Sequence, residues 1–267
     1  MNDTSPIIIL GMHRSGTSMI SDMLSAAGIF MGYKKNIHGE ADFFLRINDT
    51  LLAKAHAYWD YPLPFYELLA DETYKCTTVN ELQSKIASAD FKKNYLHKCL
   101  WNYKSMPPYW GWKDPRTTIT FPLWHEIFPR AKYIFVYRNG IDVAHSLYVR
   151  EQKRNTANPI LSLRCKTIEK AFALWEEYND FFWSHAALIH NQTFILRYED
   201  FINDTDNQIM SLMYFLGVEK NKIPKTFSQH TKSENGYKFT RNPLLTDLYH
   251  LVKNKPLMQR YGYDKII

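Results

Sequence analysis

Hydrophobic and polar positions follow one another along the chain in a way that predicts strands and helices in turn. Residues 7–10 (IIIL) form a short apolar, β-branched run that is typical of a buried strand. A glycine-containing turn follows at once. After it, apolar residues recur with helical spacing at Met19, Ile20, Met23, Leu24 and Ala27. Gly28 stands where such a helix would end, so this N-terminal part predicts a strand, a loop and a helix.

The middle of the chain continues this alternation. Residues 43–56 and 80–104 have nearly helical spacing, whereas the aromatic, proline-punctuated stretch 58–79 predicts an irregular insertion near a binding mouth. The sequence YWGWKDP predicts a short strand that ends at Pro115. The sequence AKYIFVYRN predicts a buried parallel strand that runs into a turn at residues 139–140.

The C-terminal half adds the remaining elements. Helices are predicted over residues 141–150, 163–190 and 207–216, with a strand at TFILRYED and a loop at HTKSENGYKFTRNP. Strands that alternate with helices indicate an α/β fold with a parallel sheet, which binds ligands at the carboxyl ends of its strands. No repeat or break in composition divides the chain, so we expect one domain over residues 1–267.

Composition narrows the classes of partner. With 45% hydrophobic and 22% charged residues, the 267-residue chain has the composition of a globular protein. Its 33 basic and 27 acidic residues give a net charge of +6, which suits an anionic ligand, but it has no long basic block of the nucleic-acid kind. Three widely spaced cysteines argue against a disulfide framework or a zinc site. We expect a cytoplasmic protein, because no apolar run suits a signal sequence or a membrane span.

The sequence GMHRSGTSMI has the frame of the phosphate-binding loop G-x-x-x-x-G-K-[ST]. Gly11, Gly16 and Ser18 are in place, but Thr17 stands where that motif has lysine, and Arg14 lies inside the loop. A glycine turn at a helix start offers N–H groups and a positive dipole end to an oxyanion. The loss of the lysine together with the presence of Arg14 predicts a ligand with a terminal phosphate monoester, held without a metal ion. The alternative is a tight turn without a ligand.

A second anion site is indicated by the sequence YIFVYRNGIDVAHSLYVRE. Arg138 ends the predicted strand, and Ser146 lies on the second turn of the helix that follows. An arginine that leaves a strand and a serine on the next helix can converge on one phosphate. The two motifs together predict a ligand with two phosphate groups.

These motifs resemble those of the sulfotransferases that use 3′-phosphoadenylyl sulfate (PAPS). GMHRSGTS is similar to their loop for the 5′-phosphosulfate, and YRNGIDVAHSLYVRE is similar to their 3′-phosphate motif. Family members commonly have proline where this chain has Gly140, a difference in turn stiffness. WGWKDPRT and LRYEDF resemble segments of carbohydrate and protein-tyrosine sulfotransferases, most closely bacterial stand-alone members. The resemblance covers most of the chain in order.

The resemblance implies a P-loop α/β fold with about five parallel strands. It also implies transfer of a sulfuryl group from PAPS to an acceptor hydroxyl or amine, which leaves adenosine 3′,5′-bisphosphate (PAP) and needs no metal. Arg138 and Ser146 would hold the 3′-phosphate. The loop residues that would hold the 5′-phosphosulfate are Arg14, Ser15, Gly16, Thr17 and Ser18.

The same resemblance implies three catalytic residues, which are Glu40, Lys113 and Arg14. In-line sulfuryl transfer builds charge on the leaving oxygen, so the site needs a cation there and a base near the incoming hydroxyl. Glu40 is the candidate base, because related enzymes have a glutamate at a similar distance beyond the loop arginine. His38 and Asp42 are alternatives, and Glu40 could instead cap the next helix. Lys113 is the candidate that stabilises the departing oxygen.

Other residues have roles that leave alternatives open. Asp114 would orient Lys113, and Arg116 would contact the acceptor or the donor, although a lysine before Asp-Pro also suits a surface turn. Tyr198 would hydrogen-bond the nucleotide or pack in the core.

Two further groups of residues are candidates for contacts with the nucleotide and with the acceptor. The C-terminal loop would reach the 3′-phosphate and the adenine through Lys238 or Arg241. An aromatic wall for a sugar or lipid acceptor is expected from four residues that could equally pack in the core: Tyr58, Trp59, Tyr61 and Tyr66.

The sequence favours a sulfotransferase for a carbohydrate or another small-molecule acceptor. A glycolipid, a peptide tyrosine and a small alcohol stay open as acceptors, because acceptor pockets are built from variable loops. The oligomeric state is not indicated. A nucleotide or small-molecule kinase would need a loop lysine and an acidic metal ligand at a strand end, and neither FVYRN nor FILRY ends in aspartate. A relative that binds nucleotide without turnover is the second alternative.

Overall fold

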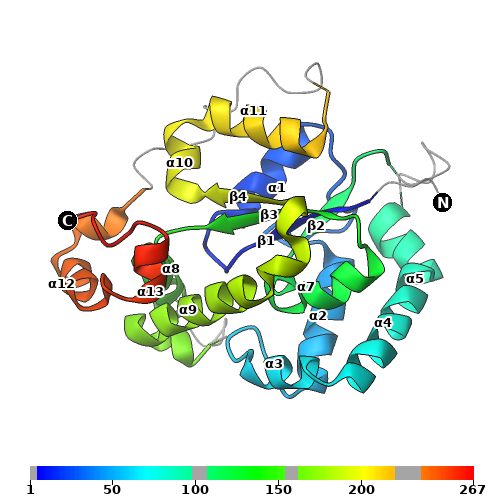
Figure 1. Ribbon diagram of the computed structural model, residues 1–267, viewed down its shortest axis with the longest axis horizontal. Coiled ribbons are helices and arrows are strands. Elements are labelled where there is room, and N and C mark those ends of the chain that lie inside the picture. The colour runs from blue at the N-terminus through cyan, green and yellow to red at the C-terminus, as the bar shows by residue number, and fades with distance from the viewer. Residues whose placement is uncertain (1–4, 98–106, 154–161, 220–235) are drawn as a thin grey trace.

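The computed structural model describes residues 5–97, 107–153, 162–219 and 236–267. Within these ranges, four parallel strands form one sheet in the order β2-β1-β3-β4 (Figure 1). The strands are β1 (Ile7–Leu10), β2 (Gly111–Lys113), β3 (Lys132–Tyr137) and β4 (Thr193–Arg197). The predicted α/β class and the four strands predicted along the chain are therefore confirmed.

The expectation of about five strands is corrected to four in the described part of the chain. Next to β2, Phe30 makes a single parallel bridge with Trp110 and accepts a hydrogen bond of 2.8 Å from the backbone N–H of Gly111. Two residues later, Gly32 has a φ of 95°, which turns the chain out of the extended conformation. The edge position is thus occupied by one bridge and does not continue as a strand.

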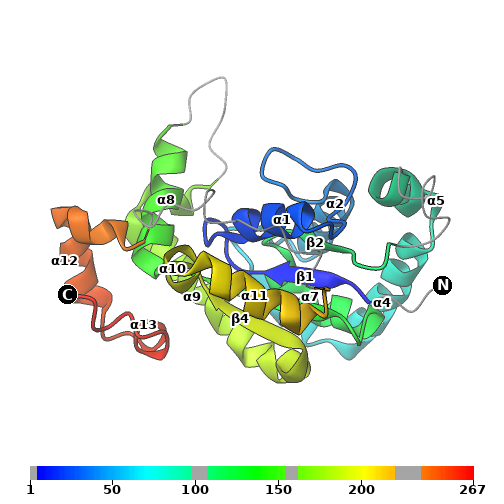
Figure 2. The ribbon, with the colours of Figure 1, turned by 90° about the horizontal axis from the view of Figure 1, so that it is seen from above.

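Helices cover both faces of the sheet (Figures 1 and 2). The α-helices of six or more residues are α1 (Thr17–Ala26), α2 (Asp42–Lys54), α3 (Leu63–Leu69), α4 (Glu72–Ile86), α7 (Thr117–Ile127), α8 (Gly140–Gln152), α9 (Ile168–His185), α10 (Tyr198–Asn203), α11 (Thr205–Leu216) and α12 (Pro243–Val252). The other described helices are α5 (Ala89–Phe91), α13 (Pro256–Arg260), η1 (Lys92–Leu96), η2 (Arg164–Lys166), η3 (Ala186–Gln192) and η7 (Lys238–Arg241).

The core lies in two layers because successive strand residues point to opposite faces. Ile8 and Leu10 of β1 pack into the cluster shared with α2, α7 and α9. Ile7 and Ile9 pack into the cluster shared with α1 and α11. All four are buried, which explains why β1 is a continuous apolar run instead of an alternating one.

The stretch 58–79 is not the irregular insertion expected from its prolines, because most of it forms α3 and the start of α4. Pro62 and Pro64 lie at the N-terminal end of α3, where a missing N–H breaks no helical hydrogen bond. Asp71 caps α4 by accepting hydrogen bonds from two backbone N–H groups of its first turn. The prolines therefore mark a helix start.

Other boundaries also differ from the expectations. The single helix expected over 163–190 is divided into η2, α9 and η3, and helix α10 directly after β4 was not expected. Of the region 80–104, residues 98–104 lie outside the described residues, as do 230–235 of the expected C-terminal loop. The polar C-terminal part contains α12, which Asn242 caps. None of the described helices combines the length and the apolar character that crossing a membrane requires.

Gly140 is the first residue of α8, and it is needed for packing as well as for the flexibility of the turn. A Cβ atom at this position would lie 2.6 Å from the indole of Trp175 and 2.8 Å from the ring of Phe172. Both rings belong to the buried core. The space that a side chain would need is therefore filled by α9.

We expect Gly140→Ala to lower the free energy of unfolding by about 1–3 kcal/mol, the usual range for overpacking a core. Urea unfolding followed by circular dichroism measures this change. In a Trp175→Leu background, which makes room, the same substitution should cost less. Equal stability of Gly140→Ala and the parent protein would contradict the packing account.

Candidate active site

The loop between β1 and α1 needs glycine at both ends. Gly11 has a φ of 139° and Gly16 a φ of 102°. A Cβ atom on Gly11 would lie 2.3 Å from the carbonyl oxygen of Val136 on β3. The backbone N–H of Gly11 instead donates a hydrogen bond of 2.8 Å to Thr118 Oγ1. The loop is therefore seated tightly against the neighbouring strand and α7.

The N-terminus of α1 is open to an anion. Its N-cap, Gly16, has no side chain to satisfy the first N–H groups, and its first turn contains no acidic residue. Ser15 is buried, and its Oγ has no hydrogen-bond partner among the described residues. Buried polar atoms usually have a partner, so an oxyanion at this helix start would satisfy several orphan donors together.

The two predicted phosphate motifs contact each other. The Nε of Arg14 donates a hydrogen bond of 2.8 Å to Ser146 Oγ on α8. Arg138, at the end of β3, donates through Nη1 to the carbonyl oxygen of Arg14 at 3.4 Å. Burial, followed by the charges of Arg150 and Arg138, lowers the pKa of Arg14. Cations brought this close repel one another, which favours an anion between them.

Tyr198 packs against the same loop. A Cβ atom on Gly16 would lie 2.5 Å from Cδ2 of Tyr198, and the guanidinium of Arg138 lies 4.5 Å from the centre of the Tyr198 ring. Burial raises the pKa of Tyr198. These contacts give the ring a supporting position beneath the loop, and its hydrogen bond to a nucleotide stays a prediction.

Glu40 is buried beside two cations. Its Oε1 lies 3.7 Å from Lys113 Nζ and its Oε2 lies 3.8 Å from Arg116 Nη1. The side chain of Asn36 donates a further hydrogen bond of 2.7 Å to Oε2. Helix α2 has Ala41 as its N-cap and no side-chain cap, so the alternative role of Glu40 as a helix cap does not apply.

Lys113 ends β2 and is 1% exposed, so it does not belong to a surface turn. Its Nζ donates hydrogen bonds to Ser18 Oγ at 3.2 Å and to the carbonyl oxygen of His38 at 2.5 Å. Burial lowers the pKa of Lys113, while the carboxylates of Glu40 and Asp114 act in the opposite direction. The loop has no lysine of its own, but this ammonium from another strand reaches its serine.

Asp114 orients an arginine instead of the lysine. Its Oδ1 accepts a hydrogen bond of 2.9 Å from Arg116 Nη1, and its Oδ2 accepts one of 2.8 Å from Asn48. Asp49 pairs with Nε of the same arginine at 2.6 Å. Arg116 is thereby held with one side toward Glu40.

One small cavity of about 40 Å³, here called the site cavity, joins these groups. Its lining residues are His13, Arg14, Thr17, Ser18, His38, Glu40, Lys113, Pro115 and Arg150. His13 and Arg150 were not expected from the sequence. Arg150 follows Ser146 by four residues, so helical spacing alone placed it on the same face of α8.

The two alternative bases occupy different positions. His38 lines the site cavity, and burial lowers the pKa of its imidazole. Asp42 does not line this cavity and pairs with Arg46 at 3.6 Å. The geometry therefore places Glu40 and His38 near Lys113, and the choice between them stays a prediction.

The expected aromatic wall is not one surface. Tyr58 and Tyr61 are exposed, whereas Tyr66 stacks on Phe181 with ring centroids 4.2 Å apart. Trp59 lies beside the loop, because its ring is 4.8 Å from that of His13. Trp59 is therefore the member of this group that the structure places next to the site cavity.

The C-terminal segment docks near Arg138. The backbone N–H groups of Lys238 and Phe239 donate to Asp142 at 3.1 and 2.9 Å, and Asp142 also pairs with Arg138 at 3.3 Å. This brings η7, which contains Lys238 and Arg241, to the start of α8. Their contact with a nucleotide stays a prediction.

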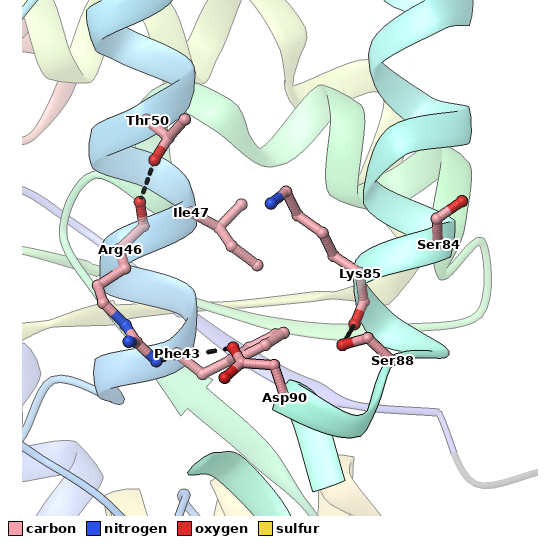
Figure 3. Close-up of a pocket in the computed structure, with 8 residues that line it drawn as sticks. All are labelled: Phe43, Arg46, Ile47, Thr50, Ser84, Lys85, Ser88 and Asp90. Carbon is pink, nitrogen blue, oxygen red and sulfur yellow. Dashed lines mark hydrogen bonds and ion pairs between the residues drawn. The ribbon is translucent and has the colours of Figure 1, made fainter. Parts of the chain in front are cut away.

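A larger groove of about 530 Å³ lies between α2 and α4 and contains none of the predicted site residues (Figure 3). Its lining residues are Phe43, Arg46, Ile47, Thr50, Ser84, Lys85, Ser88 and Asp90. Arg46 is already paired with Asp42 and, at 3.8 Å, with Asp90. The site cavity is therefore chosen as the candidate active site for the charged side chains that line it, and not for its volume. Among the described residues, no three His, Cys, Asp or Glu side chains are grouped to hold a metal ion.

Comparison with known proteins identifies the family of the chain. The profile of the Sulfotransferase family matches residues 6–222, so the chain belongs to the sulfotransferase family. No curated protein matches the chain. The sulfotransferase domain from the curacin biosynthetic pathway is 15% identical, with 93% of this chain and 97% of that chain covered and a TM-score of 0.50. That likeness shows the fold.

Two further solved structures are similar at lower scores. Sulfotransferase STF1 from Mycobacterium tuberculosis H37Rv is 13% identical, with 92% of this chain and 76% of that chain covered and a TM-score of 0.49. A sulfotransferase from Alicyclobacillus acidocaldarius is 16% identical, with 93% and 95% covered and a TM-score of 0.48.

We expect His13 to make the protein sensitive to mild acid. Burial and then the charges of Arg116, Arg150 and Lys113 lower the pKa of His13 below its usual 6.5. Below pH 6.5 the unfolded chain binds a proton that the folded protein excludes, so stability falls by up to about 1.4 kcal/mol per pH unit. His13→Phe should flatten this slope between pH 6.5 and 5.5 in urea unfolding. An unchanged slope would contradict a neutral, buried His13.

Proposed function

We propose that this sulfotransferase moves a sulfuryl group from PAPS to a hydroxyl, or an amine, of a carbohydrate or another small molecule. The observation that carries the proposal is the hydrogen bond between Arg14 and Ser146, which joins the two phosphate motifs, with Lys113 on the adjacent serine of the loop. A ligand with a phosphosulfate at one end and a phosphate at the other suits this pair of sites.

One domain over residues 1–267 and a cytoplasmic location stay predictions of the sequence.

The donor is assigned along the loop and the start of α8. Arg14 and the N–H groups of residues 15–18 would hold the 5′-phosphosulfate, because the helix start is uncapped. Arg138 and Ser146 would hold the 3′-phosphate, with Tyr198 beneath them. No metal ion is required, since cationic side chains neutralise both groups.

The transfer step follows from the positions of Glu40 and Lys113. The acceptor oxygen forms a bond to sulfur while the bond from sulfur to the 5′-phosphate oxygen breaks, and its electron pair stays on that oxygen in PAP. Glu40 accepts the proton of the acceptor hydroxyl. Lys113 donates a hydrogen bond to the oxygen on which charge develops. Arg116, held by Asp114 and Asp49, keeps Glu40 in place.

Two alternatives compete with this function. A nucleotide or small-molecule kinase gains some support because Lys113 contacts Ser18, the serine that would bind Mg²⁺ in a P-loop kinase. A relative that binds nucleotide without turnover would keep every donor contact. Donor affinity and turnover, measured separately in matched variants, distinguish these alternatives.

The 3′-phosphate should contribute affinity through Ser146. We expect the protein to bind PAP more tightly than adenosine 5′-phosphate, and Ser146→Ala to reduce that preference by about tenfold, because a charge-assisted hydrogen bond is lost. Calorimetric titration with both nucleotides measures the ratio. Ser84→Ala, an exposed serine on α4, is the control and should keep it. If Ser146→Ala weakens both nucleotides equally, Ser146 does not contact the 3′-phosphate.

Glu40 should matter for turnover and little for donor affinity. Glu40→Gln keeps the shape of the side chain but cannot accept the proton, so we expect turnover to fall by about a hundredfold or more. PAP affinity, measured by calorimetry, should stay within about twofold. The assay follows PAP formation from PAPS with 4-nitrophenol and methyl β-glucoside as acceptors.

Asp42→Asn is the matched control for this change, and His38→Asn tests the rival base. Asp42 pairs with Arg46 away from the site cavity, so its substitution should leave turnover near that of the parent. Unchanged turnover in Glu40→Gln together with a large loss in His38→Asn would transfer the role of base to His38.

A further inference from the structure

One face of α8 runs along the whole candidate site. Asp142, Ser146 and Arg150 follow one another at intervals of four residues, so they lie on the same side of the helix. Asp142 pairs with Arg138, and Ser146 accepts from Arg14. Arg150, one turn further, lines the site cavity. This face of the helix thus runs from the proposed 3′-phosphate site to the proposed site of transfer. Arg150 lies at the site of transfer.

Arg150 is held in place but retains hydrogen-bonding capacity. Its guanidinium lies over the ring of Trp59, 4.9 Å from the ring centre. Its Nε donates a hydrogen bond of 3.0 Å to Glu151 Oε1. Nη2 also lies 3.0 Å from that oxygen, but it has no partner with hydrogen-bond geometry among the described residues. Nη2 has two N–H donors, and these are available to a ligand.

The ring of His13 packs against two aromatic rings. Its centroid is 4.8 Å from that of Trp59 and 6.4 Å from that of Tyr178. Its Nε2 is buried without a hydrogen-bond partner in the described part of the chain. His13 also lines the site cavity. A buried, unpartnered ring nitrogen at a cavity wall is a group that a ligand can satisfy.

The charges around the site cavity are unequal. Among its lining residues Arg14, Lys113 and Arg150 are cationic, and Glu40 is the one carboxylate. The proposed donor engages Arg14 and Lys113. Arg150 therefore remains as a cation beside the base that would receive the acceptor.

The geometry points to an acceptor subsite, formed by Arg150, His13 and Trp59, that selects an acceptor with an anionic group near its reacting hydroxyl. This inference rests on the proposed function and names the class of acceptor. Arg150 and the Nε2 of His13 bind the anionic group, a carboxylate or a sulfate or phosphate ester. Trp59 holds the guanidinium and supplies an apolar surface. The hydroxyl is thereby directed toward Glu40.

Two pairs of probes test the subsite, and each pair differs by one carboxylate. Methyl β-glucuronide is compared with methyl β-glucoside, and 4-hydroxybenzoate is compared with 4-hydroxybenzyl alcohol. Calorimetric titration of the PAP-saturated protein measures binding without turnover. We expect the carboxylate to improve affinity by roughly tenfold or more in at least one pair, the scale of a hydrogen bond to a charged group.

Variants then assign the preference to Arg150. Arg150→Gln should abolish the preference for the carboxylate while PAP affinity stays within twofold, and Arg150→Lys should restore part of it because the charge returns. Arg130→Gln is the matched control, since Arg130 is an exposed arginine that precedes β3 at the end of the strand away from the site. It should retain the full preference.

The outcomes separate this inference from the proposed function. Failure of PAP to bind would overturn the proposed function itself. Tight PAP binding without a preference for the carboxylate in either pair, including no binding of any probe, would overturn the subsite alone. A preference that survives Arg150→Gln would overturn it as well. If Arg150→Gln weakens PAPS but not PAP, Arg150 contacts the sulfuryl group of the donor and not the acceptor.

Discussion

The buried ammonium of Lys113 connects the parts of this site. A lysine that is 1% exposed is costly unless its donors are satisfied, and here a backbone carbonyl, a serine hydroxyl and a nearby carboxylate share that task. Those partners come from the segment around His38, from the first turn of α1 and from Glu40. One side chain at the end of β2 therefore fixes the loop and the residues before α2 relative to each other. The residue at position 17 is threonine, and the cation comes from a different strand.

The second organising feature is the face of α8 that packs against the loop. A glycine at the start of the helix lets it approach the rings of α9, and the side chains that follow then face Arg138, Arg14 and the site cavity in succession. The result is a row of cations with few carboxylates, in which burial and mutual repulsion lower the pKa of Arg14. An anionic ligand relieves that repulsion, so the same arrangement that costs stability in the free protein favours binding.

The features that could be predicted from the sequence are those that depend on residues close together in the chain. The apolar run of β1, the glycines of the loop and the spacing from Arg138 to Ser146 are all short-range features, and the structure contains each of them. What local pattern could not show was burial: Lys113 resembles a surface turn until the fold encloses it. The prolines near α3 resemble a loop because a helix start and a break have similar composition. Helical spacing could have placed Arg150 beside Ser146. The contacts of Arg150 and His13 with Trp59 could not be predicted, because they join positions that are distant in the sequence.

We propose that the loop between β1 and α1 binds a sulfated monophosphate and not a triphosphate. Calorimetric titration of the purified protein with PAP in the absence of metal, and separately with ATP and Mg²⁺, tests this proposal. We expect micromolar binding of PAP and little binding of ATP. Preference for ATP with Mg²⁺ would contradict it and would identify Lys113 as the lysine of a rearranged kinase loop.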